Sequence, residues 1–462
     1  MRVAIIVDSP KRDFDGALLT AYQLARRGAE AFLVPMYQQG YDLPWLCPDG
    51  VIVNYARENN RELLAAYRSL GICVMVMDTE GGVLSDAGLD APLNWARTMR
   101  GGGLGPYVDR YFFWGSRLYE AFRVESGMPA EALHVTGCPR FDFCAPPWRR
   151  LLEFPARDYV LVNTNFSAIN PAFTRSTQTE RAIFRQIGWA EPYVERLFAD
   201  LEGVFPRYLE TLERLTARLP AIRFRIRPHP FEDAAIYERR FGQLPNVAVD
   251  GSGSVLPAIA NAACVLHLNC GTAVESLMLG TPAVSMEFLN TDTMRSHAPL
   301  PSRVSTAAGS FRDLEDLVSS AGALRERHAG RHAELCEQFL HPWFHRIDGR
   351  AAERVAEQAI CALAGRGQPR RSARASLFGS RSASTARLLS GVACNALGSD
   401  RASRLAGLGV PQRRAKALAV EAAQSGIARL RALDGAGPGL SVARARHPVS
   451  RLAMASIRVA AE

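Results

Sequence analysis

The sequence predicts an α/β protein with two successive units, each built on a parallel β-sheet, and a basic C-terminal tail. Its 462 residues are enough for two or three domains. Short apolar runs alternate with helical patterns through residues 1–150, and the alternation resumes after a proline-rich linker at 145–158. Such alternation indicates parallel sheets that are covered by helices on both faces. Beyond Arg366 the composition changes, which indicates a third region.

The first unit, residues 1–150, is expected to hold six strands. Parallel sheets of this kind bind ligands at the carboxyl ends of their strands, so the loops that follow the strands are the candidate sites. Two of the intervening helices are expected at Ala17–Arg27 and Arg61–Leu70. The expected strands are Val3–Val7, Ala31–Pro35, Val51–Asn54, Cys73–Asp78, Arg110–Trp114 and His134–Thr136.

The second unit, residues 151–365, is expected to begin with a strand at Tyr159–Val162. Residues 180–218 are charged and helical in pattern, and a last helix is expected from Gly349 to Leu363. The other expected strands are Ile222–Ile226, Val247–Val249, Val265–Leu268 and Ala283–Met286.

The tail, residues 366–462, differs from the rest in charge and composition. It carries 17 basic and 4 acidic residues, whereas residues 1–365 carry 38 basic and 42 acidic residues. It is rich in Ala, Arg, Ser and Gly, and Phe378 is its only aromatic residue. We therefore expect it to be disordered or weakly helical, with helical patches at Gln412–Leu430 and Val442–Val459. Its charge predicts contact with an anionic membrane surface, and its lack of aromatic residues disfavours nucleic-acid binding. A dispensable extension is the alternative.

The composition excludes several classes of protein. At 48% hydrophobic and 22% charged residues, the chain is neither disordered throughout nor fibrous. No apolar run approaches the roughly 20 residues of a membrane helix, and Asp8 interrupts the first apolar run too early for a signal peptide. We expect a cytoplasmic protein. The nine cysteines form no C-x-x-C pair, which disfavours zinc and disulfides. No metal or cofactor is expected.

The loop after the first expected strand is a candidate anion site. It contains Lys11 and Arg12, the former being one of only two lysines in the chain. A cation at the carboxyl end of a parallel strand is placed to contact an anionic ligand. The loop lacks the G-x-G-x-x-G pattern of dinucleotide-binding proteins. Asp15 is an alternative helix cap in the same loop.

Two carboxylates follow the fourth expected strand, in the run Asp78-Thr79-Glu80-Gly81-Gly82. A carboxylate in a partly desolvated cleft has a raised pKa, which suits a general base. The two glycines let the backbone approach a substrate closely. Glu80 is preferred to Asp78 as the catalytic base. The alternative is a turn whose acids cap the next helix.

The strand at 222–226 ends in Arg227-Pro228-His229-Pro230. An arginine and a histidine held rigidly at the carboxyl end of a strand suit a phosphate leaving group. His-Pro alone is a weak signal, because it recurs at His341 and His447. The strand-end position distinguishes Arg227 and His229 as candidate donor-binding residues.

A third candidate loop, Asn269 to Pro282, predicts a strand, a tight turn and one short helix. A helix N-terminus reached through Gly271 is an anion site, so Gly271 and Thr272 are candidate phosphate ligands. Glu275 is a candidate ligand of ribose hydroxyls. The spacing Thr272-x-x-Glu275 also predicts a capping box, which accounts for both residues structurally.

Seven segments within about residues 1–360 carry a family resemblance. They are Asp8–Asp13, Val34–Gly40, Asn54–Arg57, Asp78–Gly82, Thr136–Asp142, Val162–Phe166 and Ile347–Ala351. Together they resemble the bacterial surface carbohydrate biosynthesis proteins. The wider resemblance is to GT-B glycosyltransferases of capsule and lipopolysaccharide assembly and to CDP-glycerol glycerophosphotransferases, which share a His-Pro motif and a later Ser/Thr…Glu helix. The tail has no counterpart.

The resemblance implies a GT-B-like fold, two Rossmann-like domains facing a cleft, with the acceptor on residues 1–150 and the nucleotide donor on residues 151–365. It implies transfer of a sugar or polyol phosphate from a CMP- or CDP-linked donor to a glycan or lipid-linked acceptor, by a protein peripheral to the inner face of the inner membrane. Glu80 is then the base, and His229, Thr272 and Glu275 lie at the nucleotide. Asp-Thr-Glu-Gly-Gly departs from the usual paired-acid-Gly motif, so the choice of acid stays open. A UDP-sugar 2-epimerase and a non-catalytic organiser of capsule assembly are the alternatives.

Overall fold

The computed structural model describes residues 1–78, 95–152, 158–174, 176–186, 189–367, 392–394, 396–409, 411–435 and 439–462. These residues form two compact units. The first comprises the described residues of 1–82, 95–151 and 344–462, and the second those of 152–343. Each unit is an α/β structure on one sheet, and the predicted fold class is confirmed in that respect.

The sheet of the first unit has eight strands among the described residues, in the order β13-β14-β2-β1-β3-β4-β5-β6. From β2 to β6 all neighbours are parallel. Each of the six predicted strands is present to within a residue. The strands are β1 (Arg2–Val7), β2 (Glu30–Pro35), β3 (Gly50–Val53), β4 (Cys73–Met77), β5 (Arg110–Phe113), β6 (Leu133–Val135), β13 (Leu440–Arg446) and β14 (Ala453–Ala461).

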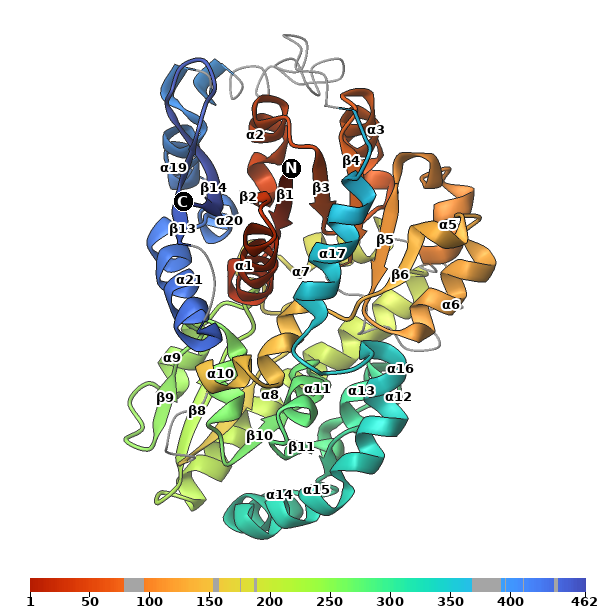
Figure 1. Ribbon diagram of the computed structural model, residues 1–462. Coiled ribbons are helices and arrows are strands. Elements are labelled where there is room, and N and C mark those ends of the chain that lie inside the picture. Colours follow the sequence, from red (N-terminus) through yellow and green to blue (C-terminus); the bar gives the residue numbers. More distant parts are fainter. Residues whose placement is uncertain are drawn as a thin grey trace. The chain divides into compact units, whose positions relative to one another are not determined.

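Helices cover the sheet of the first unit, and they come from both ends of the chain (Figure 1). Gly16 lets α1 approach the backbone of Arg140, where a Cβ would lie 2.7 Å from the Arg140 nitrogen. The helices are α1 (Pro10–Arg26), α2 (Gln39–Leu46), α3 (Arg61–Ser69), α5 (Trp95–Gly101), α6 (Ser116–Glu125), α17 (Ala351–Leu363), α19 (Ser399–Gly409), α20 (Pro411–Ala415) and α21 (Val420–Asp434).

The sheet of the second unit has six parallel strands among the described residues, in the order β12-β11-β10-β7-β8-β9. Only β12 has no predicted counterpart. The strands are β7 (Tyr159–Asn163), β8 (Arg223–Arg227), β9 (Val247–Val249), β10 (Cys264–His267), β11 (Ala283–Ser285) and β12 (Thr306–Ala307).

The helices of the second unit include α8 (Glu191–Arg218), whose apolar side chains pack into the core with those of the central strands. The others are α7 (Thr177–Gln186), α9 (Ala235–Phe241), α10 (Val255–Ala260), α11 (Thr272–Met278), α12 (Asp292–His297), α13 (Pro299–Arg303), α14 (Phe311–Ser319) and α15 (Ala321–Leu335), and α16 (His341–Phe344) lies at the sequence boundary between the units. Among the described residues, no helix combines the length and the apolar character that crossing a bilayer requires.

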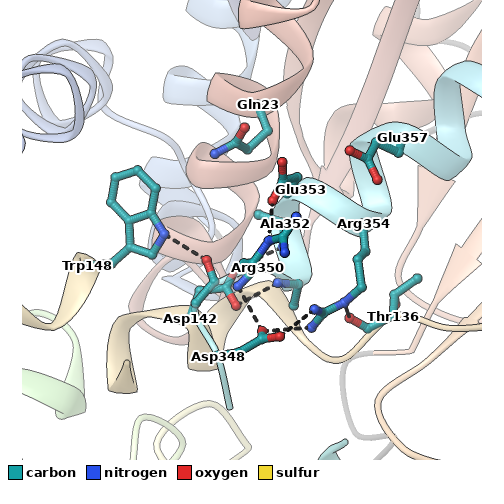
Figure 2. A network of polar contacts seen from close by, with 12 residues as sticks. Gln23, Thr136, Asp142, Trp148, Asp348, Arg350, Ala352, Glu353, Arg354 and Glu357 are labelled. Carbon is teal, nitrogen blue, oxygen red and sulfur yellow. Dashed lines mark hydrogen bonds and ion pairs between the residues drawn. The ribbon is translucent and has the colours of Figure 1, made fainter. Parts of the chain in front are cut away.

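Helix α17 belongs to the first unit, although the predicted boundary at residue 365 assigns it to the second. Its anchor is Asp142, which is 3% exposed and whose carboxylate accepts hydrogen bonds of 2.8 Å from the backbone N–H groups of Ala351 and Ala352. Burial raises the pKa of Asp142 to about 7, against the opposing effect of these N–H groups and of the Arg354 charge. Figure 2 shows this carboxylate at the start of the helix.

A second set of bonds fixes the loop before α17 (Figure 2). The Arg354 guanidinium donates to the Thr136 carbonyl at 2.7 Å and to both carboxylate oxygens of Asp348, at 2.8 and 3.1 Å. The Trp148 indole N–H donates to the Gly349 carbonyl at 2.9 Å. Residues 136–148 and 348–354 are thereby held together, which joins the returning chain to the first unit.

The prediction of a disordered or weakly helical tail is wrong for Leu440–Arg446 and Ala453–Ala461, which form strands, whereas α19, α20 and α21 are helical. Strand β14 pairs antiparallel with β2, with Ile457 opposite Leu33, and β13 pairs with β14. Ile457 is completely buried. The Ser456 N–H and hydroxyl both donate to the buried carboxylate of Asp42, at 2.9 and 2.5 Å. The predicted helical patch at 442–459 is therefore a pair of strands.

Helix α21 completes the attachment of the C-terminal segment to α1. A Cβ on Gly426 would lie 2.3 Å from a methyl group of Leu18, so any larger residue there would require the Leu18 side chain to move. The Tyr22 hydroxyl donates to Asp434 at 2.8 Å, and Arg26 pairs with the same carboxylate at 2.6 Å. The segment therefore covers both a face and an edge of the first unit.

We expect Ile457→Ala to lower the free energy of unfolding by about 2–5 kcal/mol, because it opens a cavity in a fully buried site. Val124, 62% exposed on α6, is the control, and Val124→Ala should change the same quantity by less than about 0.5 kcal/mol. Chemical denaturation measures both. Equal, small effects would show that the C-terminal segment is not part of the folded unit.

Candidate active site

Three neighbouring strands of the second unit end at one place. Strand β7 lies between β10 and β8, and all three run parallel. Asn163, the last residue of β7, donates from Nδ2 to the Thr272 hydroxyl at 2.9 Å. The hydroxyl of Thr164, the next residue, accepts a hydrogen bond of 3.0 Å from the backbone N–H of His229. Candidate residues that lie more than 40 positions apart are thereby joined through the end of β7.

The ring of His229 has a defined orientation. Its Nδ1 accepts the backbone N–H of Phe231 at 3.2 Å, and the two rings lie 5.7 Å apart between centroids. An accepting Nδ1 carries no proton, so the neutral ring carries its proton on Nε2. That N–H is a suitable donor to a phosphate oxygen, which is the role predicted for His229.

The guanidinium of Arg227 holds the loop that follows β9. Its Nη1 donates to the Ser252 carbonyl at 2.6 Å, and its Nη2 donates to the Gly253 carbonyl. The side chain is 7% exposed. Burial lowers the pKa of Arg227, and the charges of Asp250 and Glu275 act in the opposite direction. Arg227 thus brings positive charge to the strand end, while two of its donors bind the protein itself.

The predicted capping box at the start of α11 is wrong. The N-cap is Gly271, and no side chain caps the helix there. Thr272 is instead the first helical residue, and its hydroxyl accepts from Asn163 and donates to the Cys270 sulfur at 3.2 Å. Glu275 lies in the first turn and is 8% exposed. A capping role therefore does not account for Thr272.

Sequence reasoning assigned no role to two polar groups behind this site. Glu232, 4% exposed, accepts the Thr164 hydroxyl at 2.8 Å and the Phe166 N–H at 2.7 Å. Burial raises its pKa, and these hydrogen bonds oppose the rise. Asn165 donates to the Asn269 carbonyl at 2.8 Å. The sequence feature that could have identified these groups is the polar run at residues 163–165, which directly follows the apolar run at residues 160–162.

In the first unit, Asp78 directly follows β4 and is 2% exposed. Its carboxylate lies 3.2 Å from the Arg57 guanidinium and accepts the Tyr111 hydroxyl at 3.2 Å. Arg57 in turn lies over the Trp95 ring, 3.9 Å from its centroid. Asp78 is therefore a buried, ion-paired acid. Glu80, the preferred base, lies outside the described residues.

Lys11 and Arg12 lie in the first turn of α1, directly after β1. Lys11 is exposed. Arg12 pairs with Asp13 at 2.8 Å and with Asp8 at 3.2 Å. The alternative of Asp15 as a helix cap gains no support, because Ser9 is the N-cap and its N–H donates to Asp13 at 3.0 Å.

Lys416 lies in the C-terminal segment, and its side chain reaches the loop that follows β1. Its side chain is 11% exposed, and its ammonium group pairs with Asp8. The ammonium also lies 3.5 Å from the Met36 sulfur and 5.1 Å from the centroid of the Tyr37 ring. Met36 and Tyr37 follow β2, the strand beside β1. The C-terminal segment thus supplies a cation to the carboxyl edge of the first sheet.

The predicted residues therefore fall into two groups, one in each unit. Lys11, Arg12 and Asp78 lie at the carboxyl edge of the first sheet. Arg227, His229, Gly271, Thr272 and Glu275 lie at the carboxyl edge of the second. No cluster of three or more His, Cys, Asp or Glu side chains suited to a metal ion occurs within the described parts of the chain.

Comparison with known proteins gives similarity in structure only. No protein-family model matches the chain, and no curated protein sequence matches it. Among solved structures, UDP-GlcNAc 2-epimerase from Neisseria meningitidis bound to UDP-GlcNAc is 13% identical, with a TM-score of 0.46 over 78% of this chain and all of that one.

Two further structures are similar to the same extent. MnaA from S. aureus with UDP is 12% identical over 80% of this chain and 99% of that one, with a TM-score of 0.48. The wall teichoic acid polymerase TagF is 11% identical over 79% of this chain and 89% of that one, with a TM-score of 0.47. At this level of similarity, any assignment of function depends on the side chains of this chain.

The position of Lys416 is directly testable, because Lys11 and Lys416 are the only lysines. We expect an amine-reactive reagent to modify Lys11 quickly and Lys416 slowly in the folded protein, as read by mass spectrometry. Lys416→Met should lower the free energy of unfolding by about 1.5–3 kcal/mol, because Asp8 loses a charged hydrogen-bond partner. Lys11→Met should change it by less than about 0.5 kcal/mol. Equal labelling of both lysines would contradict the assignment.

Proposed function

We propose that the chain is a GT-B-like glycosyltransferase of bacterial surface polysaccharide biosynthesis. It transfers a sugar or polyol phosphate from a cytidine-nucleotide donor to a glycan or lipid-linked acceptor. The observation that carries the proposal is the junction of three strand ends in the second unit, where Asn163 binds Thr272 and Thr164 binds the backbone of His229. Such strand ends are where open α/β sheets bind ligands.

In this proposal the nucleotide phosphates lie against Gly271, Thr272 and His229. The backbone N–H groups at the start of α11 and the Nε2 proton of His229 are hydrogen-bond donors suited to phosphate oxygens. Arg227 adds positive charge and fixes the loop at 252–253. Glu275, in the first turn of α11, binds the ribose hydroxyls. The N–H groups of α11, the His229 ring and the Arg227 charge stabilise the negative charge that the leaving nucleotide acquires.

The acceptor belongs to the first unit in this proposal. Asp78 is already engaged by the Arg57 guanidinium and the Tyr111 hydroxyl, which gives this carboxylate a structural role at the end of β4. Glu80 therefore removes the proton of the acceptor hydroxyl. With a sugar donor, the resulting oxygen nucleophile attacks the anomeric carbon, and the bond from that carbon to the phosphate oxygen breaks as the nucleotide leaves. With a polyol phosphate donor, the oxygen attacks the distal phosphorus of the diphosphate, and the bond from that phosphorus to the bridging oxygen breaks as CMP leaves.

The proposal also includes a peripheral position at the inner face of the inner membrane. Its support is the charge of the C-terminal segment, with 17 basic and 4 acidic residues after residue 365. Anionic lipids attract basic segments by about 1 kcal/mol for each arginine near the surface.

His229→Ala should weaken nucleotide binding by about 1.5–3 kcal/mol, because one charged hydrogen bond to phosphate is lost. His341→Ala is the matched control, and it should leave nucleotide affinity unchanged. His341 also precedes a proline, but its exposed ring pairs with Glu337 at 2.7 Å. Titration calorimetry with CMP, CDP and UDP measures both variants. Unchanged affinity in His229→Ala for every nucleotide that binds would remove His229 from the donor site.

The reaction type is tested by incubating the purified protein with CMP-, CDP- and UDP-linked donors. We expect release of nucleotide only when an acceptor is added. Glu80→Gln should keep nucleotide binding and lower turnover by about 10²–10⁴-fold, as for loss of a general base. Conversion of UDP-GlcNAc to its 2-epimer without an acceptor would show an epimerase. Nucleotide binding without any turnover would favour the non-catalytic organiser.

A further inference from the structure

Exposed aliphatic side chains are concentrated in the described parts of the C-terminal segment. Nine large apolar side chains are exposed among the described residues, and five of them lie between positions 392 and 452. Single exposed apolar residues are ordinary, but a cluster calls for an explanation. The five are Val392, Leu397, Leu405, Val449 and Leu452.

These side chains come from two chain segments that lie against each other. The first contains Leu397 and α19, and the second is the turn between β13 and β14 (Figure 1). The Ala455 N–H donates to the Ser399 hydroxyl at 2.9 Å. A Cβ on Gly398 would lie 3.0 Å from the Cβ of Leu452. Leu397 is therefore a neighbour of Leu452 on the surface.

The turn is held in shape by its own hydrogen bonds. Nδ1 of the His447 ring accepts hydrogen bonds from the backbone N–H groups of Val449 and Ser450, at 3.2 and 3.1 Å. The His447 backbone N–H donates to the Leu452 carbonyl at 2.9 Å, and the His447 ring lies 4.3 Å from that of Trp45. This ordered turn keeps Val449 75% exposed to water. In the free protein, the Val449 side chain therefore buries little apolar surface.

The same two segments carry positive charge. Arg401, Arg404, Arg446 and Arg451 are exposed. The single acidic residue in the described parts of 392–405 and 446–452 is Asp400, which is 6% exposed and pairs with Arg404 and with Arg444. The surface therefore presents aliphatic groups among arginines, with almost no exposed negative charge.

We propose that the turn at residues 446–452 and the adjoining chain at residues 397–401 bind an anionic lipid bilayer through their exposed aliphatic side chains and arginines. Val449 at the tip of the turn and Leu452 enter the boundary between headgroups and acyl chains, and the arginines contact lipid phosphates. Aliphatic rather than aromatic side chains favour a bilayer over single-stranded nucleic acid, which needs stacking platforms. This inference rests on the proposed peripheral position and supplies its contact surface, but it does not depend on any catalytic activity.

The test is sedimentation of the full-length protein with phosphatidylglycerol-containing vesicles, compared with phosphatidylcholine alone. We expect binding to the anionic vesicles that falls at high salt, because screening weakens the arginine contacts. Arg446→Gln with Arg451→Gln should lower the partition coefficient by about 25-fold, about fivefold for each arginine. Val449→Ser with Leu452→Ser should lower it at least about tenfold, since two buried aliphatic groups are lost.

The matched control is Val124→Ser with Arg123→Gln, two exposed neighbours on α6 of the same unit. It should bind vesicles as the unchanged protein does. A Val449→Trp variant gives a second readout, because its fluorescence should shift to the blue and be quenched by brominated acyl chains. The inference is overturned if the unchanged protein does not bind, if the control loses as much as the test variants, or if the introduced indole stays in water while the Val449→Trp variant is bound.

Discussion

Burial of both faces of the central strands β7 and β10 is the constraint on which the candidate donor site depends. In β7, Val160, Leu161 and Val162 are at most 1% exposed, so no polar side chain fits before the strand reaches its last residue, Asn163. In the neighbouring strand β10, Cys264, Val265 and Leu266 are likewise completely buried, and the neighbour on the other side, β8, places Arg227 at the same edge. The candidate site is thus a consequence of strand order, and hydrogen bonds such as Asn163 to Thr272 give it a fixed geometry.

The first unit follows the same rule but is completed from the far end of the chain. Helix α17 is attached through Asp142, and β14 covers the edge that β2 would otherwise expose. An exposed strand edge invites pairing with other chains, so this cover has a physical purpose of its own. It also brings Lys416 to Asp8. One segment therefore covers a sheet edge of the unit and also supplies a cation to the carboxyl edge of the same sheet.

The parallel strands could be predicted because continuous apolar runs between helical patterns leave few alternatives. The C-terminal strands could not, because β14 contains four alanines, which favour helix, and its burial depends on pairing with residues more than 400 positions away. Likewise, sequence placed Arg227 at a strand end but not its bonds to Ser252 and Gly253. Local patterns show where side chains lie along the chain, whereas their partners depend on tertiary structure.

The central claim is that the carboxyl edge of the second sheet holds the donor nucleotide. The most direct measurement is a crystal structure of the protein soaked or co-crystallised with CMP, CDP or UDP. The account predicts phosphate oxygens within hydrogen-bond distance of the Thr272 N–H and of Nε2 of His229, and ribose hydroxyls at Glu275. A nucleotide bound at another place, with these three residues untouched, would contradict it.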